Sequence, residues 1–172
     1  MALVDLAPVC IDRFEARVEH GRAVSARGQV PTDSITWHAA LAACEAVGKR
    51  LCTVAEWEAA CRGPEERTYP YGDDYERGRC NTGEEDMPID HMRIAPTGSH
   101  AACKTPEDVF DLSGNVQEWR SDLDPSGSLR STGGGSFSVP NDEVVCVRRS
   151  PTWLAPENAI SGVGFRCCAD PS

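Results

Sequence analysis

Nine cysteines in 172 residues constrain this chain more than any other feature of its sequence. They stand at positions 10, 44, 52, 61, 80, 103, 146, 167 and 168. This density is typical of proteins that fold in an oxidising compartment, where disulfides persist. No two cysteines have the CxxC spacing of a zinc ribbon, and the odd count leaves at least one thiol without a partner in the chain. We therefore expect a disulfide-bonded protein that is secreted, periplasmic or on the cell surface.

Length and composition favour a single loop-rich α+β domain spanning residues 1–172. The 15 glycines and 12 prolines are typical of abundant turns rather than of a helical bundle. The net charge of −10 argues against a nucleic-acid partner or an anionic membrane surface, since both need clustered lysines and arginines. No apolar run approaches the roughly 20 residues of a membrane span. The first residues, MALVDLAPVC, contain no visible signal peptide, so export would imply a trimmed chain.

Two helices are predicted in the first half of the chain. Residues 35–48 show a helical spacing of apolar residues, with Thr36 as the capping residue and a glycine as terminator. A second helix begins at Thr53 with the capping box TVAE and ends at a Gly-Pro pair. Each helix carries one cysteine on its apolar face, Cys44 and Cys61, and we expect both to be disulfide ends.

The remaining sequence predicts short strands and one long irregular region. A strand is expected at 10–15, a loop or weak hairpin through about 29, and further strands at 133–137, 144–149 and 162–169. Residues 69–105 show little periodicity, which is unusual inside a compact domain unless something holds them. Cys80 and Cys103 bracket this region, and we predict a disulfide between them.

A sharp turn interrupts the apolar run VFDLSGNVQEW at residues 109–119. Gly114 and Asn115 both tolerate a positive φ, so the chain can reverse there. The turn would direct backbone carbonyls and the carboxylates of Asp111 and Glu118 toward one side. Such an oxygen-rich arrangement suits calcium. The alternative interpretation is an ordinary turn with solvated carboxylates.

Seven motifs follow one another along the chain: CIDRFE, ITWHAALAAC, GKRLCTVAEWEAACRG, YPYGD, DLSGNVQEW, GGGSF and GFRC. In this order the sequence resembles the formylglycine-generating enzyme (sulfatase-modifying factor) family over residues 10–169. The resemblance implies a variant of the C-type lectin fold, with two helices, small antiparallel sheets and much irregular loop. That fold agrees with the α+β class that the sequence patterns predict.

The resemblance also implies calcium at the central turn. Asp111 and Glu118 would supply carboxylates, and Gly114 and Val116 would supply backbone carbonyls, which together suit a divalent cation. A second calcium site of the family would map onto Asn81, Thr82 and Asp86, in a loop whose length differs from that of the family.

Two long-range disulfides are implied in the same way. Cys44 would bond to Cys167, and Cys61 would bond to Cys146. Each would close a loop of roughly 85 to 120 residues, which in the chain-entropy model stabilises the fold by about 4 to 5 kcal/mol. Of the remaining thiols, Cys10 could pair with Cys52 or with Cys168.

The chain departs from the family where the enzymes bind copper. In those enzymes two cysteines, five positions apart, follow the GGS strand, because copper(I) is soft and requires thiolates. Here GGGSF is followed by SVPNDEVV, which contains no cysteine, and about Val139 occupies the first of the two positions. We therefore expect neither copper nor formylglycine-generating activity.

Three other chemistries fit parts of the sequence less well. A zinc site could be drawn from Cys80, His91, His100 and Cys103, but the spacing matches no finger pattern. Ser99 and His100 with Asp90 or Asp108 could form a hydrolytic triad, but nothing places the serine on a nucleophile elbow. An unpaired Cys52 or Cys168 could be a redox thiol, although a buried inert thiol is the simpler interpretation.

Two functional hypotheses remain. The first is a non-catalytic binding or scaffold domain that presents loops on a rigid frame to a protein, peptide or glycan, or to a partner domain of a larger protein. The second is an enzyme of the family, or a diverged oxidoreductase, whose active site has moved. The predicted ligand-binding residues are Phe137, Val139, Asn141, Arg148, Trp153 and Asn158. Trp153 could alternatively be a core aromatic residue.

Overall fold

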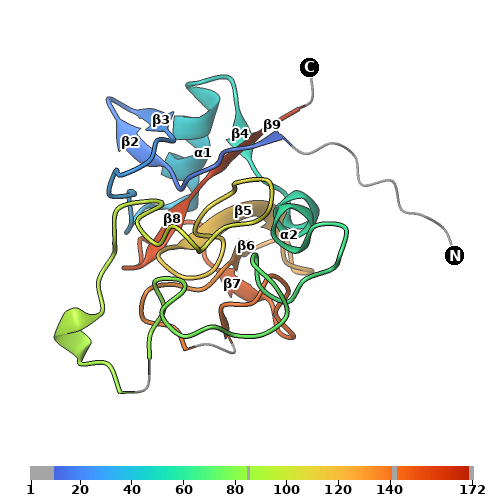
Figure 1. Ribbon diagram of the computed structural model, residues 1–172. Helices are drawn as coiled ribbons and strands as arrows, with labels where there is room; N and C mark the ends of the chain where they lie inside the picture. Colours follow the sequence, from blue (N-terminus) through green and yellow to red (C-terminus); the bar gives the residue numbers. More distant parts are fainter. Residues whose placement is uncertain (1–9, 85, 141–142, 171–172) are drawn as a thin grey trace, which may run out of the picture.

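The computed structural model describes residues 10–84, 86–140 and 143–170. Its elements in chain order are β1 (Cys10–Ile11), β2 (Arg17–Glu19), β3 (Arg22–Val24), α1 (Trp37–Glu45), β4 (Arg50–Leu51), α2 (Val54–Arg62), the 3-10 helix η1 (Ile89–His91), β5 (Gln117–Leu123), β6 (Arg130–Gly133), β7 (Thr152–Leu154), β8 (Val163–Phe165) and β9 (Cys167–Ala169). Figure 1 shows these short elements linked by long irregular segments. The predicted α+β class is confirmed.

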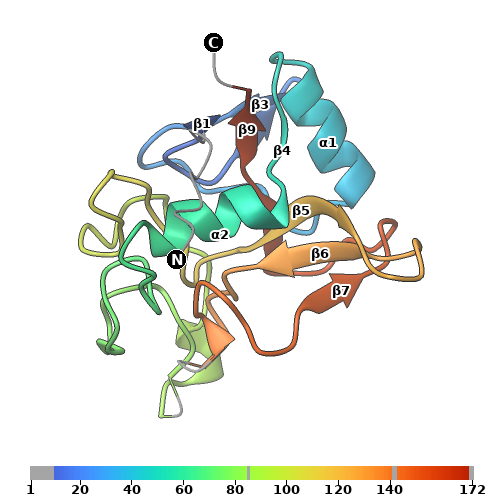
Figure 2. The same ribbon diagram turned by 90° about the vertical axis from the view of Figure 1, so that its right-hand side faces the viewer.

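Three small sheets organise the chain. The strand orders are β1-β9-β4, β2-β3 and β7-β6-β5-β8. All pairs are antiparallel except β5 with β8, which run parallel, so the four-stranded sheet is mixed rather than purely antiparallel. Figure 2 shows α1 and α2 above this sheet, with the irregular segments of the middle of the chain gathered to one side.

Both helices form where the sequence predicts them. The Thr36 side chain accepts a backbone hydrogen bond at the start of α1, and Thr53 with Glu56 completes the capping box of α2. However, α1 ends at Glu45, earlier than expected. Gly48 does have a left-handed φ of +73°, but it lies in the turn after the helix, where its N–H donates to the Glu45 carbonyl over 2.9 Å.

The strand predicted at 133–137 lies earlier in the chain, because two glycines end it. The strand β6 ends at Gly133, because Gly134 and Gly135 have φ values of +86° and +67° that extended backbone does not allow. The prediction of a strand at 144–149 is also wrong. That segment is irregular, and the next strand is β7.

An arginine divides the predicted closing strand at 162–169. The chain forms β8, then β9, and these two strands belong to different sheets. Arg166 stands between them and turns its side chain into the interior, where it is 1% exposed. The predicted strand at 10–15 keeps only β1, whereas the weak hairpin expected before residue 29 is present as β2 and β3.

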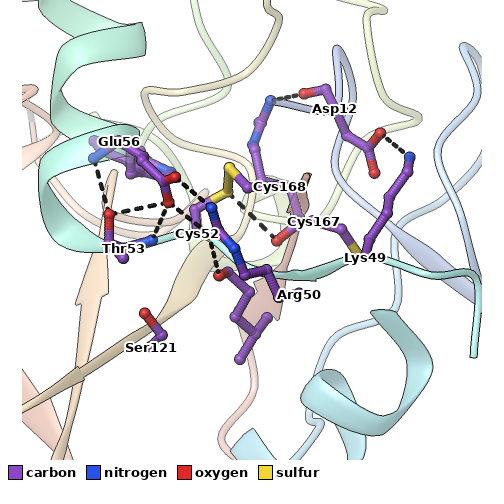
Figure 3. The surroundings of a disulfide bond; sticks show 12 residues. Asp12, Lys49, Arg50, Cys52, Thr53, Glu56, Ser121, Cys167 and Cys168 are labelled. Atoms are coloured by element: carbon purple, nitrogen blue, oxygen red, sulfur yellow. Dashed lines mark hydrogen bonds and ion pairs between the residues drawn. A yellow bond between two sulfur atoms is a disulfide. The ribbon is translucent and has the colours of Figure 1, made fainter. Parts of the chain in front are cut away.

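Four disulfides connect distant parts of the chain. Three were predicted and are confirmed: Cys44–Cys167, Cys61–Cys146 and Cys80–Cys103. The fourth joins Cys52 to Cys168, which corrects the expectation that Cys10 would take one of these two thiols. Cys10 is free and exposed on β1. In the surroundings of this fourth bridge, Arg50 reaches Glu56 at the start of α2 (Figure 3).

The core consists of two apolar clusters. One joins α1 to the mixed sheet through Trp37, Trp119 and Phe165. The other surrounds Trp57 and Leu112 and contains the Cys52–Cys168 and Cys61–Cys146 bridges. The described part of the chain contains no helix with the length and apolarity that crossing a bilayer would require.

Candidate functional site

The central turn at residues 111–116 is a tightly packed backbone structure. Asp111, Gly114 and Asn115 have φ values of +58°, +80° and +57°. A Cβ on Gly114 would lie 2.2 Å from the carbonyl oxygen of Asn81, so a side chain cannot fit there. Asn115 N donates to that same carbonyl over 2.8 Å. The turn predicted from the Gly-Asn pair is therefore present, and it packs against the loop that contains Asn81.

Glu118 is fully buried and bonded on both carboxylate oxygens. Arg166 Nε lies 2.9 Å from Oε1 and 2.7 Å from Oε2, and Arg166 Nη2 lies 2.6 Å from Oε1. Trp57 Nε1 donates to Oε2 over 2.6 Å. The remaining Arg166 donors reach the carbonyls of Asp12 (3.0 Å) and Phe110 (2.8 Å). The sequence analysis did not identify this pair, although its two members come from the DLSGNVQEW and GFRC motifs.

Two further carboxylates lie close to this ion pair. Glu15 accepts hydrogen bonds from Val116 N (2.9 Å) and Asn115 Nδ2 (2.5 Å), and Asp111 accepts one from the backbone N–H of residue 98 (2.6 Å). Burial raises the pKa of Glu15 well above its ordinary value, and the charges of Asp111 and Glu118 raise it further. Burial also raises the pKa of Asp111 to about 6, although the hydrogen bond from the backbone N–H of residue 98 acts to lower it.

These three carboxylates and Arg166 give the calcium prediction mixed support. Three acids stand against one guanidinium in the interior, so ionisation of all three would leave an excess of negative charge, which a divalent cation would offset. Glu118, however, already has hydrogen-bond donors on both oxygens. Among the described residues, no group of three or more His, Cys, Asp or Glu side chains is arranged to hold a metal ion. The charge balance therefore fits calcium better than the arrangement of donors does.

The residues of the second predicted calcium site do not share one environment. Thr82 is buried, and its hydroxyl lies 3.0 Å from the Tyr75 hydroxyl. Asp86 is exposed and pairs with Arg77. Asn81 Nδ2 donates to the side chain of Asn115 over 2.9 Å, which brings this loop against the central turn.

The segment after Phe137 contains valines where the enzymes of the family carry cysteines. Val139 is partly buried, and Val144, five positions further on, is 1% exposed. The cysteine that follows, Cys146, is bonded to Cys61. All nine cysteines lie among the described residues, and eight of them are in disulfides. The described structure therefore places no free thiol in this segment.

The predicted ligand-binding residues lie in different local environments. Phe137 N donates to the Asn115 carbonyl over 2.9 Å, so Phe137 is fastened to the central turn. Arg148 donates to Thr152 Oγ1 (2.9 Å) and pairs with Glu143. Trp153 is partly buried on β7, Asn158 is exposed, Val139 follows Phe137, and Asn141 lies outside the described residues.

A cavity of about 800 Å³ lies beside Arg148. Its wall contains Arg62 at the end of α2, Arg67 just after it, and the adjacent pair Arg148 and Arg149. Apart from Arg148, these arginines were missed in the sequence analysis. No motif or spacing marks them, because residues 62–67 and 148–149 come together through tertiary contacts, the Cys61–Cys146 bridge among them.

The disulfides exclude the alternative zinc site. Cys80 and Cys103 are bonded to each other, and neither sulfur is free to bind a metal. The redox-thiol alternative is wrong for the same reason, since Cys52 is bonded to Cys168. Within the described residues, no hydrogen bond links Ser99 or His100 to a carboxylate. Burial lowers the pKa of His100.

The geometry defines the class of the protein: a C-type lectin-like fold of the formylglycine-generating-enzyme type. The chain belongs to the Sulfatase-modifying factor enzyme 1-like domain family, whose profile matches residues 3–171. It is 32% identical to a formylglycine-generating enzyme of Thermomonospora curvata, over 88% of this chain and 59% of that protein. It is 30% identical to the inactive C-alpha-formylglycine-generating enzyme 2 of Mus musculus, over 87% of this chain and 52% of that protein.

Among solved structures, PvdO from Pseudomonas aeruginosa has a similar fold. The TM-score is 0.71 at 17% identity, over 95% of this chain and 81% of that one. This chain spans about half the length of the curated relatives that it matches. The family and the fold are therefore established, and the similarity covers nearly the whole of the present sequence.

Proposed function

We propose that this chain is a non-catalytic binding or scaffold domain of the sulfatase-modifying factor family. The observation that carries the proposal is the absence of free thiols beyond Cys10 in the nine-cysteine chain. Copper-dependent oxidation in the family requires two thiolates after the GGS motif, and Val139 and Val144 cannot supply them. Cys10 lies on β1, paired with β9, and not in that segment.

Two further observations support this proposal. The mouse relative named inactive is about as similar to this chain as the relatives named as enzymes, so the family fold does not require activity. The frame is also rigid, since four disulfides cross-link short elements that carry long loops. Loops on a fixed frame are where proteins commonly recognise ligands. The four disulfides are consistent with an extracellular or periplasmic location.

An aldehyde assay tests the non-catalytic role. The purified protein is incubated with a cysteine-containing sulfatase peptide and copper, and aldehyde formation is followed with a hydroxylamine probe. We expect no product above the copper-only control. Product that disappears with a copper(I) chelator would instead establish the alternative, an enzyme of the family. Arrays of peptides and glycans, with and without a calcium chelator, then test the binding role.

We also propose that calcium stabilises the central turn, with Asp111 as its main side-chain ligand and backbone carbonyls completing the shell. The excess of buried carboxylates supports this proposal. Metal analysis should find about one equivalent of calcium, and a calcium chelator should lower the melting temperature of the wild type. Asp111→Asn should remove the response to the chelator, whereas the exposed control Asp90→Asn should keep it. An unchanged melting temperature in the wild type would contradict this site.

A further inference from the structure

The arginine-lined cavity concentrates positive charge on a protein whose net charge is −10. Its charged described lining residues are Arg62, Arg67, Arg148, Arg149, Glu66 and Glu143. Four arginines stand against two glutamates in the lining itself, and Glu65 and Glu107 also pair with Arg67. Since lysines and arginines number 17 in the whole chain, nearly a quarter of them face this one cavity. Arginines therefore outnumber glutamates in the lining, whereas acidic residues outnumber basic ones in the chain as a whole.

The two walls of the cavity are held in place before any ligand binds. Cys61 at the end of α2 is bonded to Cys146, which immediately precedes the arginine-bearing loop. Cys146 N also donates to the Thr68 carbonyl over 2.9 Å. A ligand that bridges both walls would not have to order them, and such preorganisation favours affinity.

Arg67 is a buried guanidinium with unused donors. The residue is 7% exposed, and its Nη1 pairs with Glu65. Among the described residues its Nε and Nη2 have no hydrogen-bond partner, and the carboxylate of Glu107 lies 3.8 Å from Nη2. Buried arginine donors are normally satisfied, because an unpaired one loses its hydration without compensation. These two nitrogens are covered in this conformation, so a ligand would interact with the charge of Arg67, or with its donors once the guanidinium turns.

The other arginines are more accessible. The side chain of Arg149 is exposed and makes no ion pair or hydrogen bond within the described residues. Arg62 faces Glu66 at 3.7 Å, beyond hydrogen-bond distance. Arg148 is half-buried and is held by Glu143 and Thr152. A guanidinium presents paired N–H groups that match the oxygens of carboxylates and phosphates.

From these observations we propose that the cavity binds a dianionic oxyanion ligand of small-molecule size, such as a phosphate monoester or a dicarboxylate. Two negative charges would match the excess of arginines over glutamates among the lining residues, and a cavity of about 800 Å³ lies within the range of small-molecule sites. This deepens the proposed binding function and rests on it, because Arg148 is one of the predicted ligand-binding residues and Glu143 pairs with it. The proposal adds the chemical class of the ligand to that binding function.

Titration of the whole chain with inorganic phosphate and with succinate, at constant ionic strength, tests the proposal. The readouts are isothermal calorimetry and NMR of the arginine side-chain Nε–H groups. We expect saturable binding of at least one of the two anions with a dissociation constant of about 1 mM or tighter. Tighter binding of phosphate would identify a phosphate monoester as the ligand class, and tighter binding of succinate would identify a dicarboxylate. Absence of saturation with both would overturn the proposal.

Three variants make the test specific. Arg149→Gln should weaken binding about tenfold, since a charged hydrogen bond is lost at a residue that has no structural partner in the described part of the chain. Arg22→Gln, a matched charge change on the β2–β3 hairpin, should leave affinity unchanged. Glu143→Gln should tighten binding severalfold, because it releases Arg148 and removes a repulsive carboxylate. Equal weakening by Arg149→Gln and Arg22→Gln would show non-specific attraction and overturn the site. Aldehyde formation by the wild type would refute the proposed function without affecting these titrations.

Discussion

Two regions of this protein each bury an arginine, and they differ in how many of its hydrogen-bond donors have partners. Around β9, Arg166 directs its guanidinium nitrogens to Glu118 and to two backbone carbonyls. Beside the cavity, Arg67 pairs through Nη1, while its Nε and Nη2 find no hydrogen-bond partner in the described part of the chain. Its nearest carboxylates, Glu65 and Glu107, have side chains that are 66% and 58% exposed.

The difference separates a structural role from a role in recognition. A buried charge whose hydrogen bonds are complete has nothing left to offer a ligand, but it fixes the elements that hold it. Arg166 thereby connects β5, the segments next to β1 and to the central turn, and the junction of β8 with β9. A buried charge with unused donors beside a cavity is instead not committed to the fold, so its donors can meet a ligand once the guanidinium turns, at some cost in stability.

The largest effect is expected for Glu118→Gln. This variant removes the carboxylate that is hydrogen-bonded to the buried Arg166, and we expect the free energy of unfolding to fall by about 4 kcal/mol. Urea denaturation followed by tryptophan fluorescence measures the loss. Glu65→Gln is the matched change beside Arg67, and it should cost less than about 1 kcal/mol, since Glu65 is exposed. Similar losses in the two variants would remove the distinction between the two regions.

A somewhat smaller loss is expected on removal of the Cys52–Cys168 bridge. The double variant Cys52→Ala and Cys168→Ala opens a loop with a sequence separation of 116. We expect a loss of about 3 kcal/mol, within the usual range for native disulfides. Cys10→Ser is the control, because Cys10 is free and exposed, and it should leave the denaturation midpoint unchanged.

Removal of the Cys61–Cys146 bridge should affect the cavity more than the fold. In the variant Cys61→Ala and Cys146→Ala the loop of residues 143–150 loses its covalent attachment to α2. We expect a loss of about 2 kcal/mol in stability and a severalfold loss in phosphate or succinate affinity. The Cys52–Cys168 variant, measured where it is still folded, should retain that affinity. If the Cys61–Cys146 variant kept its affinity and the Cys52–Cys168 variant lost it, the Cys61–Cys146 bridge would not be what holds the cavity in place.

The smallest effect concerns the ion pair of Glu56 with Arg50 (Figure 3). The hydrogen bond from Arg50 lowers the pKa of Glu56 from its ordinary 4.5 to about 2. A lowered pKa in the folded state means that stabilisation is present above pH 4.5 and is lost as the pH falls toward 2. Glu56→Gln should therefore cost about 1 kcal/mol at pH 7. The difference from the wild type should shrink in denaturation series below pH 4, and a constant difference would contradict this origin.

Local signals in the sequence predicted the helices, the central turn and one short-range bridge. Thr36 and the Thr53–Glu56 box act within one helical turn, so their effect is readable from spacing alone. Cys80 and Cys103 were paired because they bracket an aperiodic stretch. The family resemblance, rather than spacing, supplied the partners of Cys44 and Cys61.

The failures arise where tertiary contacts override local pattern. Gly134 and Gly135 stand in an apparent strand but adopt positive φ. Arg166 interrupts the last strand, because its side chain is required at Glu118. The cavity could not be predicted, since Arg67 and Arg149 are 82 residues apart and no periodicity connects them. Calcium and the identity of a ligand stay predictions.

Cys167 and Cys168 are neighbours on β9, so correct disulfide pairing depends on which face of the strand each side chain occupies. Their correct bridges have sequence separations of 123 and 116, so exchanging partners would give rings of almost equal size. Ring-closure entropy cannot distinguish the two outcomes. The alternation of side chains along the strand can distinguish them, because Cys167 and Cys168 lie on opposite faces. Cys167 belongs to one apolar cluster and Cys168 to the other. A shift of one residue against β4, where Leu51 faces Cys167, would present each sulfur to the wrong partner. The pairing of β4 with β9 must therefore be settled before these thiols are oxidised, and a thiol-exchange catalyst would be needed to repair any chain in which it was not.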